Sequence, residues 1–179
     1  MIFVSSLQKI QPGMHSQIKV LFVCMGNICR SPTGEGVFRH YVAQAGHAES
    51  ILVDSAGISD YHVGSPSDLR MRQAAVSRGY ALTSSARQVT VEDMVDFDLI
   101  VAMDEDNLMA LERLANGSGD HIRMLGTYLG ETVSNARARS VPDPYYGGAA
   151  GFEAVLDMIE AACPAMLTHS LELLQAKRG

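Results

Sequence analysis

Four short apolar runs divide the chain, and turn-forming or polar residues separate them. The runs span residues 18–23, 51–53, 98–102 and 122–125. Aliphatic and β-branched side chains fill most of their positions, a pattern typical of parallel strands buried on both faces. The pattern therefore predicts a parallel sheet of four strands.

Apolar residues at helical spacing lie between these runs. The first predicted helix spans Pro32 to Ala45, with Ser31 as its cap and Gly46 at its end. Other helix starts are predicted at Ser67 or Asp68, at Thr90–Asp93 and at Asp104–Asp106, and a C-terminal helix is expected to be interrupted or kinked at Pro164. Strand, helix and strand in this order imply a right-handed parallel crossover. We therefore expect an α/β fold with helices on both faces of the sheet.

The length of 179 residues fits one domain with a sizeable core. Residues 1–17 lack the charged start and long apolar stretch of a signal peptide, and we expect a loosely ordered N-terminal extension there. Residues 18–179 are predicted to form the single domain. No apolar run approaches membrane-spanning length, so we expect no membrane association.

Charge and cysteine content narrow the class of protein further. The formal net charge of −6 argues against nucleic acid or an anionic membrane as a partner. An odd count of 3 cysteines gives no disulfide framework, and a reducing cytoplasm is the expected location. The 6 histidines show no metal-ligand spacing, so neither a metal nor another cofactor is predicted.

The stretch Cys24–Ser31, which directly follows the first apolar run, carries the main candidate chemistry. A loop between a strand and a helix N-terminus points backbone N–H groups at one spot, where the helix dipole adds positive potential. A phosphate would bind well there, and the same field favours the thiolate form of Cys24. Arg30 supplies a planar cation that can hold two phosphate oxygens.

The neighbouring residues suit such a loop. Gly26 allows the backbone to approach a ligand, Asn27 tolerates a left-handed conformation, and the Ser31 hydroxyl can reach the thiolate. A buried structural cysteine beside a surface arginine is the simpler interpretation of Cys24 and Arg30 taken alone. The chain has no G-x-x-x-x-G-K-[ST] motif, so ATP chemistry is not expected.

A second polar stretch, Val141–Gly148, is stiffened by Pro142 and Pro144, which flank Asp143. Expulsion of an alcohol or phenol from a phosphate ester is helped by a proton on the departing oxygen, and a carboxylic acid near the phosphate can donate it. On the local sequence alone, an acid in a type I turn is the better interpretation of Asp143.

The stretch from Val23 to Pro32 and the later Asp143–Tyr146 together resemble the low-molecular-weight protein tyrosine phosphatases. The likeness covers about residues 18–174 and includes Asp54–Gly57 and Ala86–Thr90. The resemblance implies hydrolysis of protein phosphotyrosine and small aryl phosphates, with Cys24 as nucleophile, Arg30 as phosphate ligand and Asp143 as general acid. It further implies substrate contacts from Met25, Gly26, Asn27, Ile28, Cys29, Ser31, Tyr61, Tyr145 and Tyr146.

The resemblance carries two further expectations and one departure. Cys29 is expected to protect an oxidised Cys24 by forming a reversible disulfide. Ser55 is similar to a family serine that supports the loop, although it can equally cap a turn. Many relatives have a histidine where this chain has Ser84, and that histidine supports the loop asparagine. The support of Asn27 is therefore open to question here.

Two other functions fit parts of the pattern. Thioredoxin-coupled arsenate reductases resemble this fold and loop but use two further cysteines, where this chain has Ala102 and Met109. A non-catalytic phosphotyrosine-binding module would need no acid at Asp143. The expected partner is a tyrosine-phosphorylated protein, with a bacterial tyrosine kinase as one candidate, and a monomer or weak dimer is expected.

Overall fold

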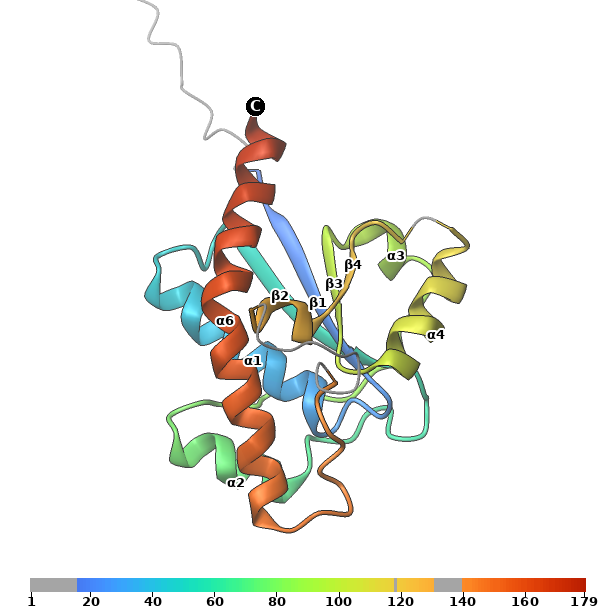
Figure 1. The fold of residues 1–179 in the computed structure, drawn as a ribbon, viewed down its shortest axis with the longest axis vertical. Helices are drawn as coiled ribbons and strands as arrows, with labels where there is room; N and C mark the ends of the chain where they lie inside the picture. Colours follow the sequence, from blue (N-terminus) through green and yellow to red (C-terminus); the bar gives the residue numbers. More distant parts are fainter. Residues whose placement is uncertain (1–15, 118, 131–139) are drawn as a thin grey trace, which may run out of the picture.

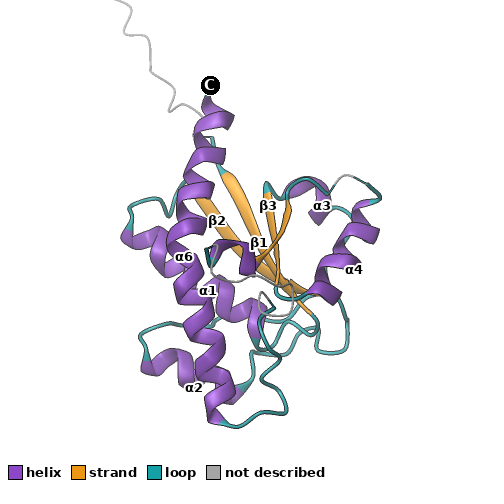
Figure 2. Cartoon of the chain, in the orientation of Figure 1, coloured by secondary structure: helices purple, strands orange, loops and turns teal. Residues whose placement is uncertain are grey.

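A computed structural model describes residues 16–117, 119–130 and 140–179. The expectation for the first 15 residues lies outside this part of the chain. The strands are β1 (Ile18–Cys24), β2 (Ile51–Gly57), β3 (Leu99–Ala102) and β4 (Ile122–Met124). They form one parallel sheet in the order β2-β1-β3-β4, so the predicted sheet is confirmed (Figures 1 and 2).

Helices cover both faces of this sheet, also as predicted. They are α1 (Arg30–Gln44), α2 (Leu69–Ser77), α3 (Asp93–Asp96), α4 (Glu105–Ala115), the 3₁₀ helix η1 (Leu125–Tyr128) and α6 (Ala149–Arg178). The long helix α6 runs beside α1 on one face, whereas α3 and α4 lie on the other (Figure 1).

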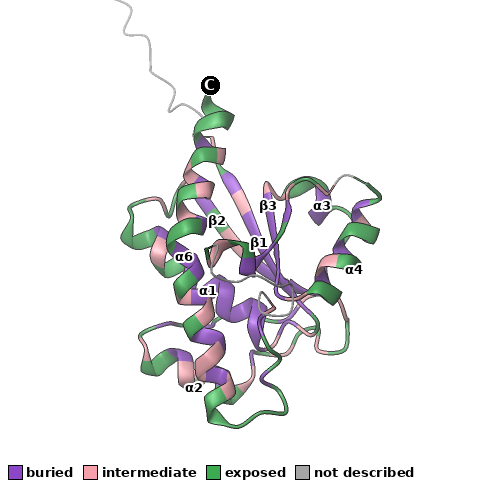
Figure 3. Ribbon diagram, in the orientation of Figure 1, coloured by how far each residue is buried: buried purple, intermediate pink, exposed green. Residues whose placement is uncertain are grey.

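Successive side chains of β1 point to opposite faces of the sheet, which explains why the core has two layers. Val20 and Phe22 pack into the cluster under α1 and α6, and Leu21 and Val23 pack into the cluster under α3 and α4. All four side chains are fully buried. Burial therefore concentrates along the sheet and the inward sides of the helices, and exposed residues face outward (Figure 3).

Most predicted helix ends are confirmed by their hydrogen bonds. Asp68 caps α2 by accepting from the Arg70 N–H, and Asp104 caps α4 by accepting from the Asn107 N–H at 2.7 Å. Thr90 and Asp93 form the predicted reciprocal capping box, in which each side chain accepts from the other's N–H. The first two bonds fix where α2 and α4 begin, whereas α3 begins at Asp93, the last residue of the box.

The structure corrects two details of the helix predictions. The first helix begins at Arg30, with Cys29 as its cap, because the Ser31 oxygen is engaged with Cys24, Asn27 and Ala56 rather than with the first turn. The C-terminal helix was expected to be interrupted or kinked at Pro164, and the interruption is absent, since α6 continues through this residue. In the part of the chain that the structure describes, no helix is both long and apolar enough to cross a membrane.

Candidate active site

The loop at the carboxyl end of β1 forms a cradle, defined here as residues 24–31. Ile58 and Ser59, directly after β2, donate their N–H groups to the carbonyls of Cys24 and Met25, both at 2.9 Å. Gly57 allows this close approach, because a Cβ there would lie 3.0 Å from the Met25 carbonyl oxygen. The cradle is therefore braced by the neighbouring strand end.

Cys24 lies at the base of the cradle and is only 3% exposed. Its Sγ lies 3.0 Å from Ser31 Oγ and accepts from the Asn27 N–H at 3.3 Å. Both contacts are stronger with a thiolate than with a thiol because hydrogen bonds to a charged acceptor are stronger. The predicted contact between Ser31 and the sulfur is therefore present.

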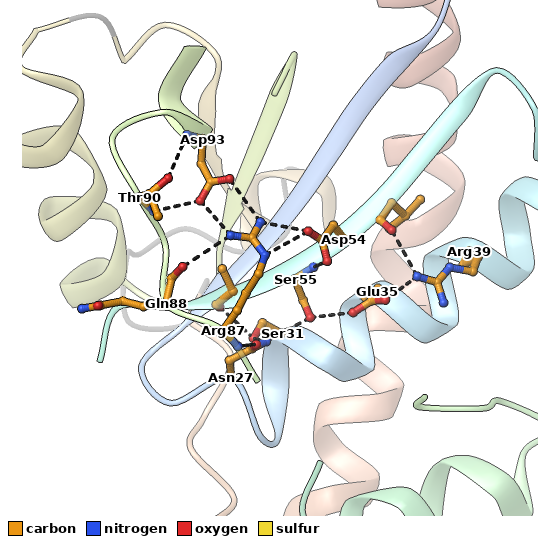
Figure 4. A network of polar contacts seen from close by, with 12 residues as sticks. Asn27, Ser31, Glu35, Arg39, Asp54, Ser55, Arg87, Gln88, Thr90 and Asp93 are labelled. Atoms are coloured by element: carbon orange, nitrogen blue, oxygen red, sulfur yellow. Dashed lines mark hydrogen bonds and ion pairs between the residues drawn. The ribbon is translucent and has the colours of Figure 1, made fainter. Parts of the chain in front are cut away.

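Asn27 adopts the left-handed conformation expected from the sequence, with φ of 53°. Its Nδ2 donates to Ser31 Oγ and Ser55 Oγ, each at 2.9 Å, and its Oδ1 accepts from the Arg87 N–H at 2.9 Å (Figure 4). Both N–H groups of this buried amide therefore donate and its carbonyl oxygen accepts once, so three of its four hydrogen-bonding positions are used.

The support of Asn27, which the serine at position 84 left open to question, is present in the structure. The Arg87 main chain holds Asn27 Oδ1, and the Arg87 guanidinium is anchored by Asp54 and Asp93 at about 3 Å (Figure 4). Gly57 also accepts from and donates to residues on either side of Gln88. The main chain of this segment therefore supports Asn27 directly.

Arg30 is 4% exposed and spans the gap between the cradle and two distant segments. Its Nη1 donates to Asp104 and to the Val141 carbonyl, and its Nη2 donates to Asp143 Oδ2 at 3.1 Å. Burial alone would lower the pKa of Arg30, but the negative charges of Cys24, Asp104 and Asp143 raise it above the ordinary value. Arg30 is therefore a fixed cation.

Asp143 lies on the acid loop, defined here as residues 140–148. Its side chain is 53% exposed, and its Oδ1 accepts from the Tyr145 N–H at 3.0 Å. Val141 anchors the start of this loop by donating its N–H to the Met103 carbonyl at 2.8 Å. The carboxyl group is thus linked to the cradle by its bond to Arg30 and remains open to solvent.

A cavity of about 450 Å³ opens over the cradle. It is lined by Cys24, Met25, Gly26, Ile28, Cys29, Arg30, Tyr61, His62, Asp143, Tyr145 and Tyr146. The structure therefore brings all three predicted catalytic residues to one cavity. Of the predicted substrate contacts, Asn27 and Ser31 do not line it, because their side chains are buried behind the wall.

Aromatic side chains form the rim of this cavity. Tyr61 is 84% exposed and Tyr146 is 95% exposed, whereas Tyr145 is partly covered. Tyr145 and Tyr146 meet edge to face at 5.0 Å, and the Arg70 guanidinium lies 5.6 Å from the Tyr145 ring centre. Such faces can stack on an aryl group bound in the cavity.

The second cradle cysteine differs chemically from the first. Burial, together with the negative charges of Asp68, Cys24 and Asp143, raises the pKa of Cys29 to about 12. Cys29 therefore stays a neutral thiol at neutral pH, although it lines the same cavity as Cys24. Among the described residues, no group of three or more His, Cys, Asp or Glu side chains could hold a metal ion.

Sequence reasoning missed three side chains around the site. His62 lies over Gly26, where an added Cβ would meet its ring at 3.0 Å, and no pattern in the sequence indicated this contact. Asp104 was predicted only as a helix cap, yet it also pairs with Arg30. Glu35 is buried behind the cradle, and its spacing of four from Ser31 and from Arg39 is a signal that could have found it.

Comparison with known proteins assigns the family. The family described as low molecular weight phosphotyrosine protein phosphatase matches residues 19–178. The human protein of that name is 40% identical over 83% of this chain and 92% of its own length. A low molecular weight protein-tyrosine-phosphatase of Streptomyces coelicolor is 40% identical over 89% of this chain and 97% of its own length.

Solved structures agree with this assignment. A protein tyrosine phosphatase from Entamoeba histolytica, solved with Hepes in its active site, superposes with a TM-score of 0.81 at 39% identity. The match covers 87% of this chain and 98% of that one. The chain described here belongs to the low molecular weight phosphotyrosine protein phosphatases.

Proposed function

We propose that this protein hydrolyses phosphotyrosine in proteins, and similar aryl phosphates, through a phosphocysteine intermediate. The observation that carries the proposal is the meeting of Cys24, Arg30 and Asp143 at one cavity rimmed by tyrosines. A nucleophile, a phosphate-binding cation and a carboxylic acid are the three groups that such a displacement needs.

In the first step, the Cys24 thiolate attacks phosphorus while the bond to the phenolic oxygen breaks. The cradle N–H groups and Arg30 hold the equatorial oxygens, where negative charge gathers. Asp143 donates a proton to the departing oxygen. Since Arg30 Nη2 bonds to Asp143 in this structure, an incoming phosphate would compete for that donor and release the carboxyl group.

In the second step, water attacks the phosphocysteine, and Asp143 accepts a proton from that water. The Cys24 thiolate leaves and inorganic phosphate is released. The Ser31 hydroxyl donates to the Ala56 carbonyl in this structure and lies 3.0 Å from the sulfur, so it would turn its proton to the leaving thiolate and support it. Splitting the reaction in this way replaces one difficult displacement by two easier ones.

The substrate ring is expected to lie between Tyr61 and the Tyr145–Tyr146 pair. Met25, Gly26, Ile28 and Cys29 complete the wall around the phosphate. The partner is then a tyrosine-phosphorylated protein, with a tyrosine kinase as one candidate. A cytoplasmic location suits the three free cysteines, and a monomer or weak dimer is the expected state.

Cys29 is proposed to protect the nucleophile. Peroxide would convert the Cys24 thiolate to a neutral sulfenic acid, which removes one of the negative charges that raise the Cys29 pKa. The Cys29 sulfur would then attack the Cys24 sulfur while its proton passes to the departing hydroxyl, so that water leaves and a disulfide forms. A dithiol restores both cysteines. If Cys29→Ser recovers as fully as the wild type after peroxide and then reductant, the protective role is wrong.

The two alternatives are less well supported. An arsenate reductase of this fold would need further cysteines, and Cys163 is fully buried in α6, with a pKa raised to about 12 by burial and by Glu160. A binding module would not need a carboxyl group beside the phosphate-binding arginine.

The deciding experiment is hydrolysis of p-nitrophenyl phosphate from pH 4 to 9 without added metal, for wild type, Cys24→Ser and Asp143→Ala. Turnover that is lost in Cys24→Ser and falls strongly in Asp143→Ala supports both roles. An inactive wild type that still binds phosphate would contradict the proposal, and an arsenate assay with thioredoxin would then separate the two alternatives.

A further inference from the structure

One face of α1 carries a row of polar side chains that leads from the nucleophile to solvent. Ser31, Glu35 and Arg39 follow one another at intervals of four residues, so they lie along the same side of the helix. Ser31 is fully buried, Glu35 is 3% exposed and the Arg39 side chain is 49% exposed. A carboxylate this deeply buried is costly unless it is paired and hydrogen-bonded.

Glu35 has a partner for each of its oxygens. Oε1 accepts from the Arg39 guanidinium, and Oε2 accepts from Ser55 Oγ at 2.6 Å (Figure 4). Arg39 is held in turn by the Val53 carbonyl at 3.1 Å. Glu35 is therefore linked to β2, the strand that braces the cradle, directly through Ser55 and indirectly through Arg39 and Val53.

The direction of each hydrogen bond in this chain follows from the chemistry of the groups. A carboxylate paired with a guanidinium can only accept, so the Ser55 hydroxyl must donate to Glu35. The Ser55 oxygen is then left to accept from Asn27 Nδ2, at 2.9 Å. The Ser55 proton is therefore directed at Glu35 Oε2.

This direction decides how the Asn27 amide is turned. With Nδ2 toward Ser55 and Ser31, the Asn27 Oδ1 faces the Arg87 N–H, which is a donor (Figure 4). The flipped amide would place its NH₂ against that N–H and its oxygen against Ser55, whose proton is already committed. Only one orientation satisfies all of these groups.

The orientation of Asn27 bears directly on the nucleophile. The Asn27 main-chain N–H donates to Cys24 Sγ at 3.3 Å, from a backbone held at a φ of 53°. A left-handed conformation costs free energy in a residue other than glycine and persists only where its surroundings enforce it. The three side-chain bonds of Asn27 are the contacts that enforce it.

We propose that Glu35 is a positioning residue for the nucleophile, which it controls by fixing the Ser55 proton and, through it, Asn27. Glu35 touches neither the cavity nor the sulfur, so it acts only through these two residues. This inference rests on the proposed function, because it assumes that Cys24 is the reacting group.

The test compares Glu35→Gln, Ser55→Ala and the double variant. The glutamine amide can lie in either of two orientations. In one, its NH₂ donates to Ser55, so the Ser55 hydroxyl can no longer donate to residue 35. In the other, its NH₂ faces the donors of the Arg39 guanidinium. We expect kcat/KM for p-nitrophenyl phosphate to fall about tenfold in each single variant. The pH at which iodoacetate inactivation of Cys24 is half-maximal should rise, because the thiolate loses a well-placed donor.

The double variant distinguishes positioning from a loss of structure. If Glu35 acts through Ser55, the double variant should be no worse than Ser55→Ala alone, whereas independent effects would multiply to about a hundredfold. Glu160→Gln is the matched control, since Glu160 also pairs with an arginine, at 2.8 Å, but on α6 away from the cradle. It should leave kcat/KM and the inactivation profile unchanged.

Three results would overturn the inference. The first is a Glu35→Gln variant whose kcat/KM and inactivation profile equal those of the wild type. The second is a double variant in which the two single losses of kcat/KM multiply in full. The third is a Glu160→Gln variant that changes as much as Glu35→Gln. If Glu35→Gln does not fold in a urea titration, Glu35→Asp keeps the charge with a shorter reach, and its profile should shift in the same direction. A wild type whose Cys24 is unreactive would instead contradict the proposed function itself.

Discussion

The cradle and the acid loop meet at one cavity but are built in opposite ways. In the cradle, Cys24, Asn27, Arg30 and Ser31 are all under 5% exposed and are cross-linked by hydrogen bonds to β2 and to Arg87. On the acid loop, the Asp143 side chain is 53% exposed, and its described contacts are Arg30 and its own loop.

The difference corresponds to the two tasks. Stabilising charge on a phosphoryl group requires donors that are already in place, because reorganising them during the reaction would cost free energy. A general acid must exchange protons with solvent and release product, so an open position suits it. We therefore expect cradle substitutions to change stability and activity together, and acid-loop substitutions to change activity alone.

Among substitutions that keep the nucleophile, the largest expected effect on rate comes from Asp143→Asn. An amide of the same shape cannot donate the proton, so kcat for phenyl phosphate should fall about 100- to 1,000-fold. The fall should be smaller for p-nitrophenyl phosphate, whose leaving group needs the proton less. The urea unfolding free energy should stay within about 0.5 kcal/mol of the wild type, as for most exposed sites. Equal falls for the two substrates would argue against the acid role.

Asn27→Ala should lower both the unfolding free energy and the rate. The buried Arg87 N–H and Ser55 hydroxyl lose a partner, which costs about 1–3 kcal/mol of unfolding free energy, and the left-handed backbone adds about 1 kcal/mol with alanine. The rate should fall about ten- to a hundredfold as the cradle loosens. Urea titration and p-nitrophenyl phosphate kinetics measure the two losses.

Asn27→Gly is the matched control for that loss, because glycine tolerates the left-handed backbone without a side chain. It should recover part of the stability but little of the rate. Full recovery of activity in Asn27→Gly would mean that backbone conformation, and not the amide network, sets the cradle geometry.

A smaller contrast is expected within the cradle, between its two cysteines. Since burial and nearby negative charges raise the pKa of Cys29 to about 12, its thiol should resist iodoacetamide at pH 7. Reactivity of Cys29 should rise with pH only as that pKa is approached, because only the thiolate reacts. Peptide mass spectrometry of the labelled native protein should find Cys24 modified, with inorganic phosphate slowing the modification.

Urea-unfolded protein is the control for that labelling, because all three cysteines should react once burial is lost. Modification of Cys29 in the native protein as fast as Cys24 would show that the two thiols share one environment. The cradle would then be less rigid than its contacts indicate.

Sequence alone predicted what depends on neighbouring residues. The apolar runs set the strands, and the order of small, polar and cationic residues between Cys24 and Ser31 set the cradle, because both are local patterns. The left-handed Asn27 followed for the same reason. One local rule failed at Ser31, whose hydroxyl bonds to Cys24, Asn27 and Ala56 instead of capping the helix.

What sequence did not predict depends on strand register and on packing across the chain. Ser55 reaches Asn27 because Phe22 pairs with Ser55 and Cys24 with Gly57 in the sheet. Arg30 meets Asp104 because β3 lies beside β1, which places residues 74 apart in sequence at the same sheet end. Such pairings cannot be read from spacing. The Arg87 contact to Asn27 comes from a main-chain N–H, which leaves no residue signature in the sequence.

The smallest expected effect is that of Tyr146→Ala, at the outer end of the acid loop. Tyr146 is 95% exposed and meets Tyr145 edge to face, so its loss removes a stacking surface and little else. An aromatic contact is worth about 0.5–1.5 kcal/mol, which corresponds to about a two- to tenfold rise in KM for a phosphotyrosine peptide. Neither kcat nor the unfolding free energy should change. Tyr146→Phe keeps the ring and should keep the wild-type KM, and a rise as large as that of Tyr146→Ala would mean that the hydroxyl, not the ring face, contacts the substrate.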